Sequence, residues 1–200
     1  FRIPSGKTAN SVKNKDNVKA PVILQHGLLD SSFTWISNYE DESLGYILAD
    51  QGFDVWFGNN RGNRFGRNHT TLDPDDGTFW DFTYDDMGLF DVPAMINYVC
   101  DSTSSETVGW VGHSEGTIQM FVAASEASNA YVQSALEKIT VFVALAPVAY
   151  VYNARPYLKA LAGAHIIDDM YDKGIYEIGK WDDQVCVMYT YCLCYCYQKI

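Results

Sequence analysis

Four short apolar segments, separated by stretches of helical character, limit most strongly how this chain can fold. Each ends at or near a glycine or proline, as buried strands of parallel sheets do. The segments are residues 20–27 (APVILQHG), 53–58 (FDVWFG), 107–112 (TVGWVG) and 139–147 (ITVFVALAP). Strands that alternate with helices predict βαβ units. We therefore expect an α/β fold in which a mostly parallel sheet carries helices on both faces.

Helices are expected between these strands. The first covers residues 43–51 and stops at Gly52, a residue type that suits a helix C-terminus. The second begins at Asp91, which can cap it, with Pro93 in the first turn. The third follows the strand at 107–112. Its expected apolar face holds Ile118, Phe121 and Val122.

A change of pattern near residue 150 divides the chain into two parts. Residues 1–150 contain the four predicted strands, whereas residues 151–200 have helical stretches without a segment of comparable apolarity. The chain begins with Phe1 rather than Met, shows no signal-peptide pattern, and ends in a segment biased toward tyrosine and cysteine. We interpret it as an internal piece of a longer product with a truncated or aberrant end.

Charge and hydropathy exclude two classes of partner. The chain has 14 basic and 25 acidic residues and a formal net charge of -11, so a nucleic-acid backbone would be repelled. No apolar run reaches the length that a membrane-spanning helix needs. The 200 residues are enough to bury a sizeable core. We therefore expect a protein with such a core, no nucleic-acid partner and no transmembrane segment.

A GxSxG pentapeptide, Gly112-His113-Ser114-Glu115-Gly116, lies between a predicted strand and a predicted helix. In this setting the spacing is typical of a nucleophile elbow, a strained turn that exposes the serine hydroxyl. Gly112 and Gly116 remove Cβ atoms that would collide in so tight a bend. We predict that Ser114 is a catalytic nucleophile; the alternative is a serine that only caps the following helix.

Acyl transfer by such a serine also needs two N–H groups that stabilise the oxyanion. The residue after the nucleophile supplies one, and the loop after an earlier strand supplies the other. These requirements predict the backbone N–H groups of Glu115 and Leu28 as donors. His26 ends the strand before Leu28, and its position favours support of the loop over proton transfer.

Beyond the pentapeptide, several segments between Arg2 and Val151 resemble signature blocks of the acid lipases, the family of gastric and lysosomal acid lipases. These are LQHGLLDSS, WISN, LADQGFDVWFGNNRGNRF, FWDFTYDDMGLFDVPAMINYV, GHSEGT and ALAPVA. The resemblance implies a partial α/β-hydrolase core over residues 1–150 and the start of a helical cap over 151–200. It assigns Ser114 as nucleophile and Leu28 and Glu115 as oxyanion-hole residues.

The same resemblance implies hydrolysis of triacylglycerols or sterol esters at a transient lipid–water interface, with neither metal nor organic cofactor. It also implies a secreted or lysosomal protein. Animal members of the family usually have Gln at the position of Glu115. A carboxylate at this position can oppose the oxyanion, unless the side chain turns away or is protonated.

The partners of the serine are the missing part of the predicted site. In α/β-hydrolases the chain order is serine, then an acidic residue, then histidine. His165 is the single histidine after Ser114, and no aspartate lies between them. Glu126 and Glu137 do precede His165, but neither follows a predicted strand, where such acids belong. The triad acid and base are therefore expected to be absent, and the chain alone to have little activity. His69 and His113 are no better candidates for the base.

Other features have more than one interpretation. Asn68-His69-Thr70 is a glycosylation sequon. Asp85, Asp86 and Asp91 could suggest a metal, but caps and a solvated face explain them more simply. Four cysteines, Cys186, Cys192, Cys194 and Cys196, crowd the end of the chain, and their spacing does not predict a zinc site. A disulfide within this segment stays open. Two other functions stay open: a carboxylesterase-type hydrolase of smaller esters, and an inactive truncated lipase-like protein.

Overall fold

The computed structural model describes residues 1–4, 6, 19–150 and 166–176. These residues form two compact units, residues 1–68 with 81–150, and residues 69–80 with 166–176. The sequence did not separate residues 69–80 from the core. The division near residue 150 stays a prediction, as does a helical cap beyond it.

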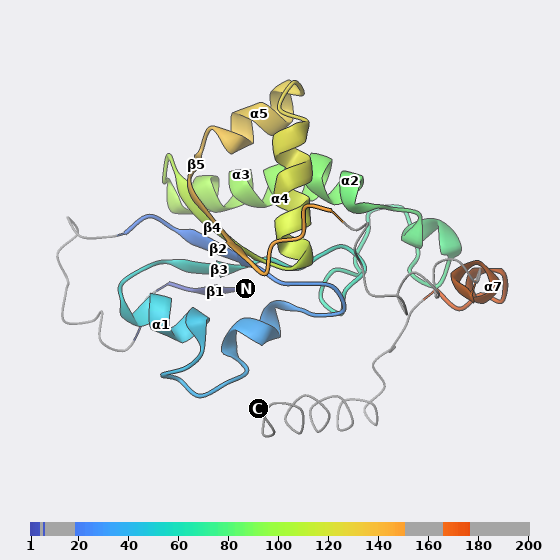
Figure 1. Cartoon of the computed structure of the whole chain (residues 1–200), viewed down its shortest axis with the longest axis horizontal. Coiled ribbons are helices and arrows are strands. Elements are labelled where there is room, and N and C mark those ends of the chain that lie inside the picture. Colours follow the sequence, from blue (N-terminus) through green and yellow to red (C-terminus); the bar gives the residue numbers. More distant parts are fainter. Residues whose placement is uncertain (5, 7–18, 151–165, 177–200) are drawn as a thin grey trace. The chain divides into compact units, whose positions relative to one another are not determined.

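A five-stranded sheet forms the centre of the first unit, in the order β1-β3-β2-β4-β5 (Figure 1). Neighbours among β2 to β5 are parallel, whereas β1 pairs antiparallel with β3. The strands are β1 Arg2–Ile3, β2 Val22–Gln25, β3 Val55–Phe57, β4 Val108–His113 and β5 Ile139–Leu145. The mostly parallel α/β class is confirmed, and β1 is the strand that the sequence did not predict.

Helices cover both faces of this sheet, with α3, α4 and α5 on one side and α1 on the other (Figure 1). Successive residues of β2 point to opposite sides, which places Ile23 in the core beneath α3, α4 and α5, and Leu24 in the core beside α1. These helices are α1 Leu44–Asp50, α3 Val92–Thr103, α4 Glu115–Ser125 and α5 Ala130–Leu136. A 3-10 helix, η3 Ser32–Ile36, adds Trp35 to the second core.

The helical run before β4 begins earlier than predicted. It starts with α2 Tyr84–Asp86, passes through a π-helical turn, η5 Met87–Asp91, and continues into α3. Thr83 caps it, and its backbone N–H in turn donates to the Asp86 carboxylate at 2.8 Å. Asp91 has helical backbone angles and makes no capping hydrogen bond, so the expectation that it begins the helix was wrong.

The buried side of α4 also differs from the expected apolar face. Ile118, Phe121 and Val122 are only partly buried. The buried residues of this helix are Glu115, Gly116, Thr117, Gln119, Met120 and Ala123. Three of them carry polar side chains, which the hydrophobic pattern did not reveal.

In the second unit, the 3-10 helix η4 Gly77–Trp80 contacts the segment that contains helix α7 Ile166–Asp172. A Cβ atom on Gly77 would lie 2.6 Å from the Tyr171 hydroxyl oxygen, so these segments approach closely. Tyr171 also makes an edge-on ring contact with Tyr176.

Candidate active site

Ser114 occupies a sharp turn between the end of β4 and the start of α4. Its backbone angles are φ 51° and ψ -110°, a conformation that residues with a side chain rarely adopt. Its N–H donates to the Leu145 carbonyl on β5 at 2.9 Å, and its carbonyl accepts from the Thr117 N–H at 2.9 Å. Hydrogen bonds to both neighbouring elements therefore hold the strained residue in place.

The two glycines of the motif permit this turn because the backbone around them is crowded. A Cβ atom on Gly112 would lie 2.5 Å from the Gly116 carbonyl oxygen. A Cβ atom on Gly116 would lie 2.5 Å from the Gln25 carbonyl oxygen on β2. Gly116 thus lets the first turn of α4 pack directly against the end of β2.

The Ser114 side chain does not cap α4. Within the part of the chain that the structure describes, its hydroxyl makes no hydrogen bond, so the interpretation of Ser114 as a simple helix cap is wrong. The hydroxyl is accordingly held on a fixed turn without an internal partner.

The loop after β2 lies against the elbow. Gln25 pairs in register with Gly112, which places residues 26–28 beside Ser114. A Cβ atom on Gly27 would lie 3.2 Å from the Ser114 Cβ atom. Leu28 and Leu29 follow, with exposed fractions of 59% and 68%. The loop therefore presents backbone and apolar side chains next to the serine.

Glu115 is the first residue of α4, so its N–H has no acceptor within the helix. Among the described residues, the Leu28 N–H also forms no hydrogen bond. Both predicted oxyanion donors are thus unengaged, on the two segments that meet at the elbow.

His26 supports the loop from inside the protein. Its Nδ1 faces the Gly27 carbonyl at 2.8 Å, and its Nε2 accepts from the Asn60 N–H at 3.2 Å. The Asn63 amide also reaches Nε2, at 2.9 Å. Burial lowers the pKa of His26, which favours the neutral ring. With both ring nitrogens engaged, His26 positions the loop.

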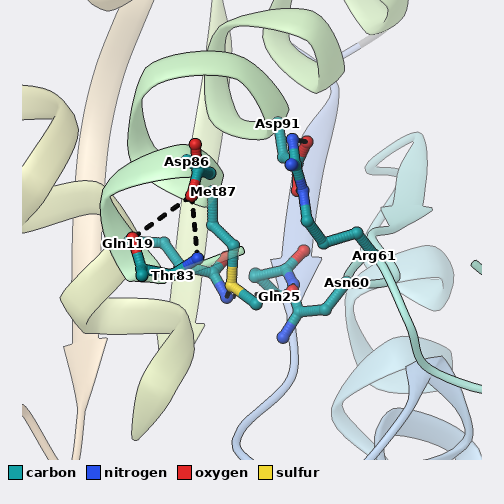
Figure 2. A network of polar contacts seen from close by, with 8 residues as sticks. All are labelled: Gln25, Asn60, Arg61, Thr83, Asp86, Met87, Asp91 and Gln119. Carbon is teal, nitrogen blue, oxygen red and sulfur yellow. Dashed lines mark hydrogen bonds and ion pairs between the residues drawn. The ribbon is translucent and has the colours of Figure 1, made fainter. Parts of the chain in front are cut away.

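A buried network of amide groups surrounds the Glu115 side chain. Only 3% of the surface of Glu115 is exposed. Glu115 Oε1 accepts from the Asn60 amide at 3.0 Å and from the Gln119 amide at 3.3 Å. Asn60 Oδ1 in turn accepts from Gln25 and from Gln119. Figure 2 shows the side chains of Gln25, Asn60, Gln119 and Met87 close to one another. Burial raises the pKa of Glu115, and the hydrogen bond from Gln119 offsets this in part.

Structural contacts account for two of the three aspartates considered as metal ligands. Asp91 forms a two-pronged ion pair with Arg61, with N–O distances of 2.7 and 2.5 Å (Figure 2). Asp86 belongs to the cap with Thr83, and Asp85 is exposed. Across residues 1–4, 6, 19–150 and 166–176, no group of three or more histidine, cysteine or acidic residues could hold a metal.

In the first unit, no described hydrogen bond joins the Ser114 hydroxyl to another candidate for a catalytic base or acid. His113 precedes it with an exposed side chain, and the His69 ring accepts backbone hydrogen bonds from its own loop in the second unit. Glu126 and Glu137 are exposed residues at the C-terminal ends of α4 and α5. His165 and the four C-terminal cysteines lie outside the described residues; Cys100 is buried and free.

Sequence reasoning missed Gln25, Asn60 and Gln119. A signal was present for each. Gln25 is a polar residue in an apolar strand, and Asn60 follows the carboxyl end of another strand, where α/β folds place their sites. Gln119 is four residues after Glu115 and so shares its helix face.

The sequence matches the family model described as "alpha/beta hydrolase fold" over residues 20–152. The chain belongs to this family. Among curated proteins, the chain is 46% identical to lipase member M of Mus musculus, over 77% of the chain and 35% of the relative. It is 42% identical to lysosomal acid lipase/cholesteryl ester hydrolase of Homo sapiens, over 85% of the chain and 41% of the relative. It is 43% identical to gastric triacylglycerol lipase of Rattus norvegicus, over 81% of the chain and 39% of the relative.

The chain thus spans about two fifths of the length of these relatives. The resemblance of its sequence blocks to acid lipases agrees with these matches. In the described part of the chain, no helix is long and apolar enough to cross a membrane.

Proposed function

We propose that this chain carries the nucleophile and the oxyanion hole of a serine hydrolase that acts on lipid esters. The observation that carries the proposal is the conformation of Ser114, which is strained, fixed by its backbone and free at its hydroxyl. Strain that the surrounding structure maintains is typical of functional positions.

In the proposed reaction, Ser114 Oγ attacks the ester carbonyl carbon and forms a tetrahedral intermediate with a negatively charged oxygen. The N–H groups of Leu28 and Glu115 donate to this oxygen, aided by the positive end of α4. Collapse expels the alcohol and leaves an acyl-serine, which water hydrolyses. The serine proton needs a base, and in the first unit no described histidine forms a hydrogen bond with the Ser114 hydroxyl.

The relatives suggest the substrate class. Their names refer to triacylglycerol and cholesteryl esters, and we extend this class to the present protein. The exposed apolar side chains of Leu28 and Leu29, in the loop that approaches the elbow, suit an acyl chain at a lipid–water interface. We further propose that residues from 151 onward begin a helical cap and that the protein is secreted or lysosomal. None of the steps assigned to these residues needs a metal or organic cofactor.

The test uses the complete gene product that contains this sequence, beside the 200-residue chain. Hydrolysis of p-nitrophenyl esters of increasing acyl length and of emulsified triolein is measured, with Ser114→Ala as the control. We expect Ser114-dependent hydrolysis of long-chain esters by the complete product and slow turnover by the 200-residue chain, because an unassisted serine loses most of the acceleration. Preference for short, soluble esters would instead indicate a carboxylesterase. Hydrolysis that survives Ser114→Ala would refute the proposal.

A further inference from the structure

Glu115 has two parts with different surroundings. Its backbone N–H lies at the start of α4, where we place the oxyanion. Its carboxyl group is buried and accepts hydrogen bonds from Asn60, which follows β3, and from Gln119 on the same helix. The helix N-terminus favours a negative charge, so a charged Glu115 and an oxyanion would compete for the same local field.

The hydrogen-bond partners of the carboxyl group are neutral. Asn60 and Gln119 donate amide N–H groups to Oε1, and no described basic side chain forms an ion pair with Glu115. Gln119 Oε1 is buried and has no hydrogen-bond partner. The amide group that donates to Glu115 therefore also holds an unused acceptor, which suits a carboxyl group that carries a proton.

The groups that face Glu115 provide no compensating positive charge. Arg61, next to Asn60 in the sequence, is bound to Asp91 by two hydrogen bonds. Burial raises the pKa of Tyr84, and the nearby charge of Glu115 raises it further. The elements packed around Glu115 contribute Gln25 from β2, Asn60 after β3, Tyr84 and Asp86 from α2, Met87 from η5, and His113 and Gln119 from β4 and α4.

We propose that Glu115 is a proton-dependent positioning residue, which supports the oxyanion hole when its carboxyl group is neutral and opposes the oxyanion when it is ionised. In the neutral form, the amide network holds the Glu115 N–H in place and leaves the positive end of α4 to the oxyanion. In the ionised form, a buried negative charge lies beside the developing one. Hydrolysis therefore slows as Glu115 becomes ionised. This inference rests on the proposed function of Ser114.

The test compares the pH dependence of kcat/KM for the complete gene product and its Glu115→Gln variant. Gln keeps the acceptor oxygen for Asn60 and Gln119, and its NH2 group can donate to the free Gln119 Oε1. We expect the ratio of kcat/KM of the variant to that of the wild type to rise about 30-fold between acid and the pH at which Glu115 is ionised, because ionisation places a like charge near the oxyanion in a medium of reduced dielectric constant. Superimposable profiles would overturn the inference.

A second measurement does not depend on catalysis. The free energy of unfolding of the 200-residue chain is measured by urea titration between acidic and neutral pH, with and without Glu115→Gln. Because the pKa of Glu115 is raised when folded, the folded state binds more protons, so stability falls as pH rises above the ordinary value of 4.5. The variant lacks this contribution. Equal pH dependence in both chains would overturn the inference even where esters are hydrolysed, whereas a difference without any ester hydrolysis would refute only the proposed function.

Discussion

Replacing Ser114 with glycine should stabilise the protein, although it removes the proposed nucleophile. At φ 51° and ψ -110°, a residue with a Cβ atom is strained by about 1–3 kcal/mol, whereas glycine adopts these angles freely. Glycine also loses more chain entropy on folding, about 0.5–1 kcal/mol. The net gain in the free energy of unfolding is therefore about 1 kcal/mol. The hydroxyl makes no hydrogen bond within the described residues, so little else is lost.

Ser114→Ala is the matched control, because alanine keeps the Cβ atom and hence the strain. We expect it to lie within about 0.5 kcal/mol of the wild type. Urea unfolding of the 200-residue chain, followed by the fluorescence of tryptophans that include the fully buried Trp110, measures all three proteins.

Ser102 provides a second comparison on the exposed last turn of α3. Here the glycine variant should be less stable than the alanine variant, by less than the about 1 kcal/mol that applies inside a helix. The change in the free energy of unfolding from the alanine variant to the glycine variant should thus have opposite signs at positions 102 and 114. If glycine is the less stable residue at both positions, Ser114 is not strained and the argument for a nucleophile elbow fails.

Three further changes test other contacts. Gly116→Ala should destabilise the chain by about 1–3 kcal/mol in urea unfolding, although alanine favours helices, because its Cβ would lie 2.5 Å from the Gln25 carbonyl. Unchanged stability would contradict the close packing of α4 on β2. Asn60→Ala removes the acceptor of the buried Gln25 amide, one acceptor of the Gln119 amide and a donor to Glu115, and should cost about 2–4 kcal/mol in the same assay; a loss below about 0.5 kcal/mol would show that the network contributes little. Asn68 lies exposed in a sequon, so secretory expression should give a glycoprotein whose electrophoretic mobility changes with Asn68→Gln, and equal mobility would rule out its use.

Much of the sheet could be predicted from the sequence because its central strands are continuous apolar runs with clear ends. All four predicted strands are present within a few residues of their expected limits. β1 was missed since two residues show no periodicity, and it exists only through pairing with β3. Asp91 was misassigned because a cap is a local signal. The cap at Thr83 starts the helix earlier, and Asp91 pairs with Arg61 instead.

In the candidate site, too, some residues could be predicted from the sequence and others could not. Ser114 and its glycines were found from sequence because the elbow is one continuous motif. The amide network was not, because Gln25, Asn60 and Gln119 come from separate segments that meet only after the sheet forms. Hydrophobic patterning also gave the wrong buried face of α4, since that face is partly polar. A pattern that assumes apolar burial fails where a fold buries polar groups.

Ser114 and Glu115 are consecutive residues that both reduce stability, one through backbone strain and one through a buried carboxyl group. The core tolerates them because the hydrogen bonds of the elbow and the amide network hold both in place. Ser114→Gly should remove the backbone strain, and Glu115→Gln should remove the buried carboxyl group. Their effects on catalysis should be opposite, since the first removes the nucleophile and the second removes a charge that opposes the oxyanion. A gain in stability therefore cannot by itself identify a catalytic residue. The pair of variants separates a feature that catalysis requires from one that limits the pH at which it proceeds.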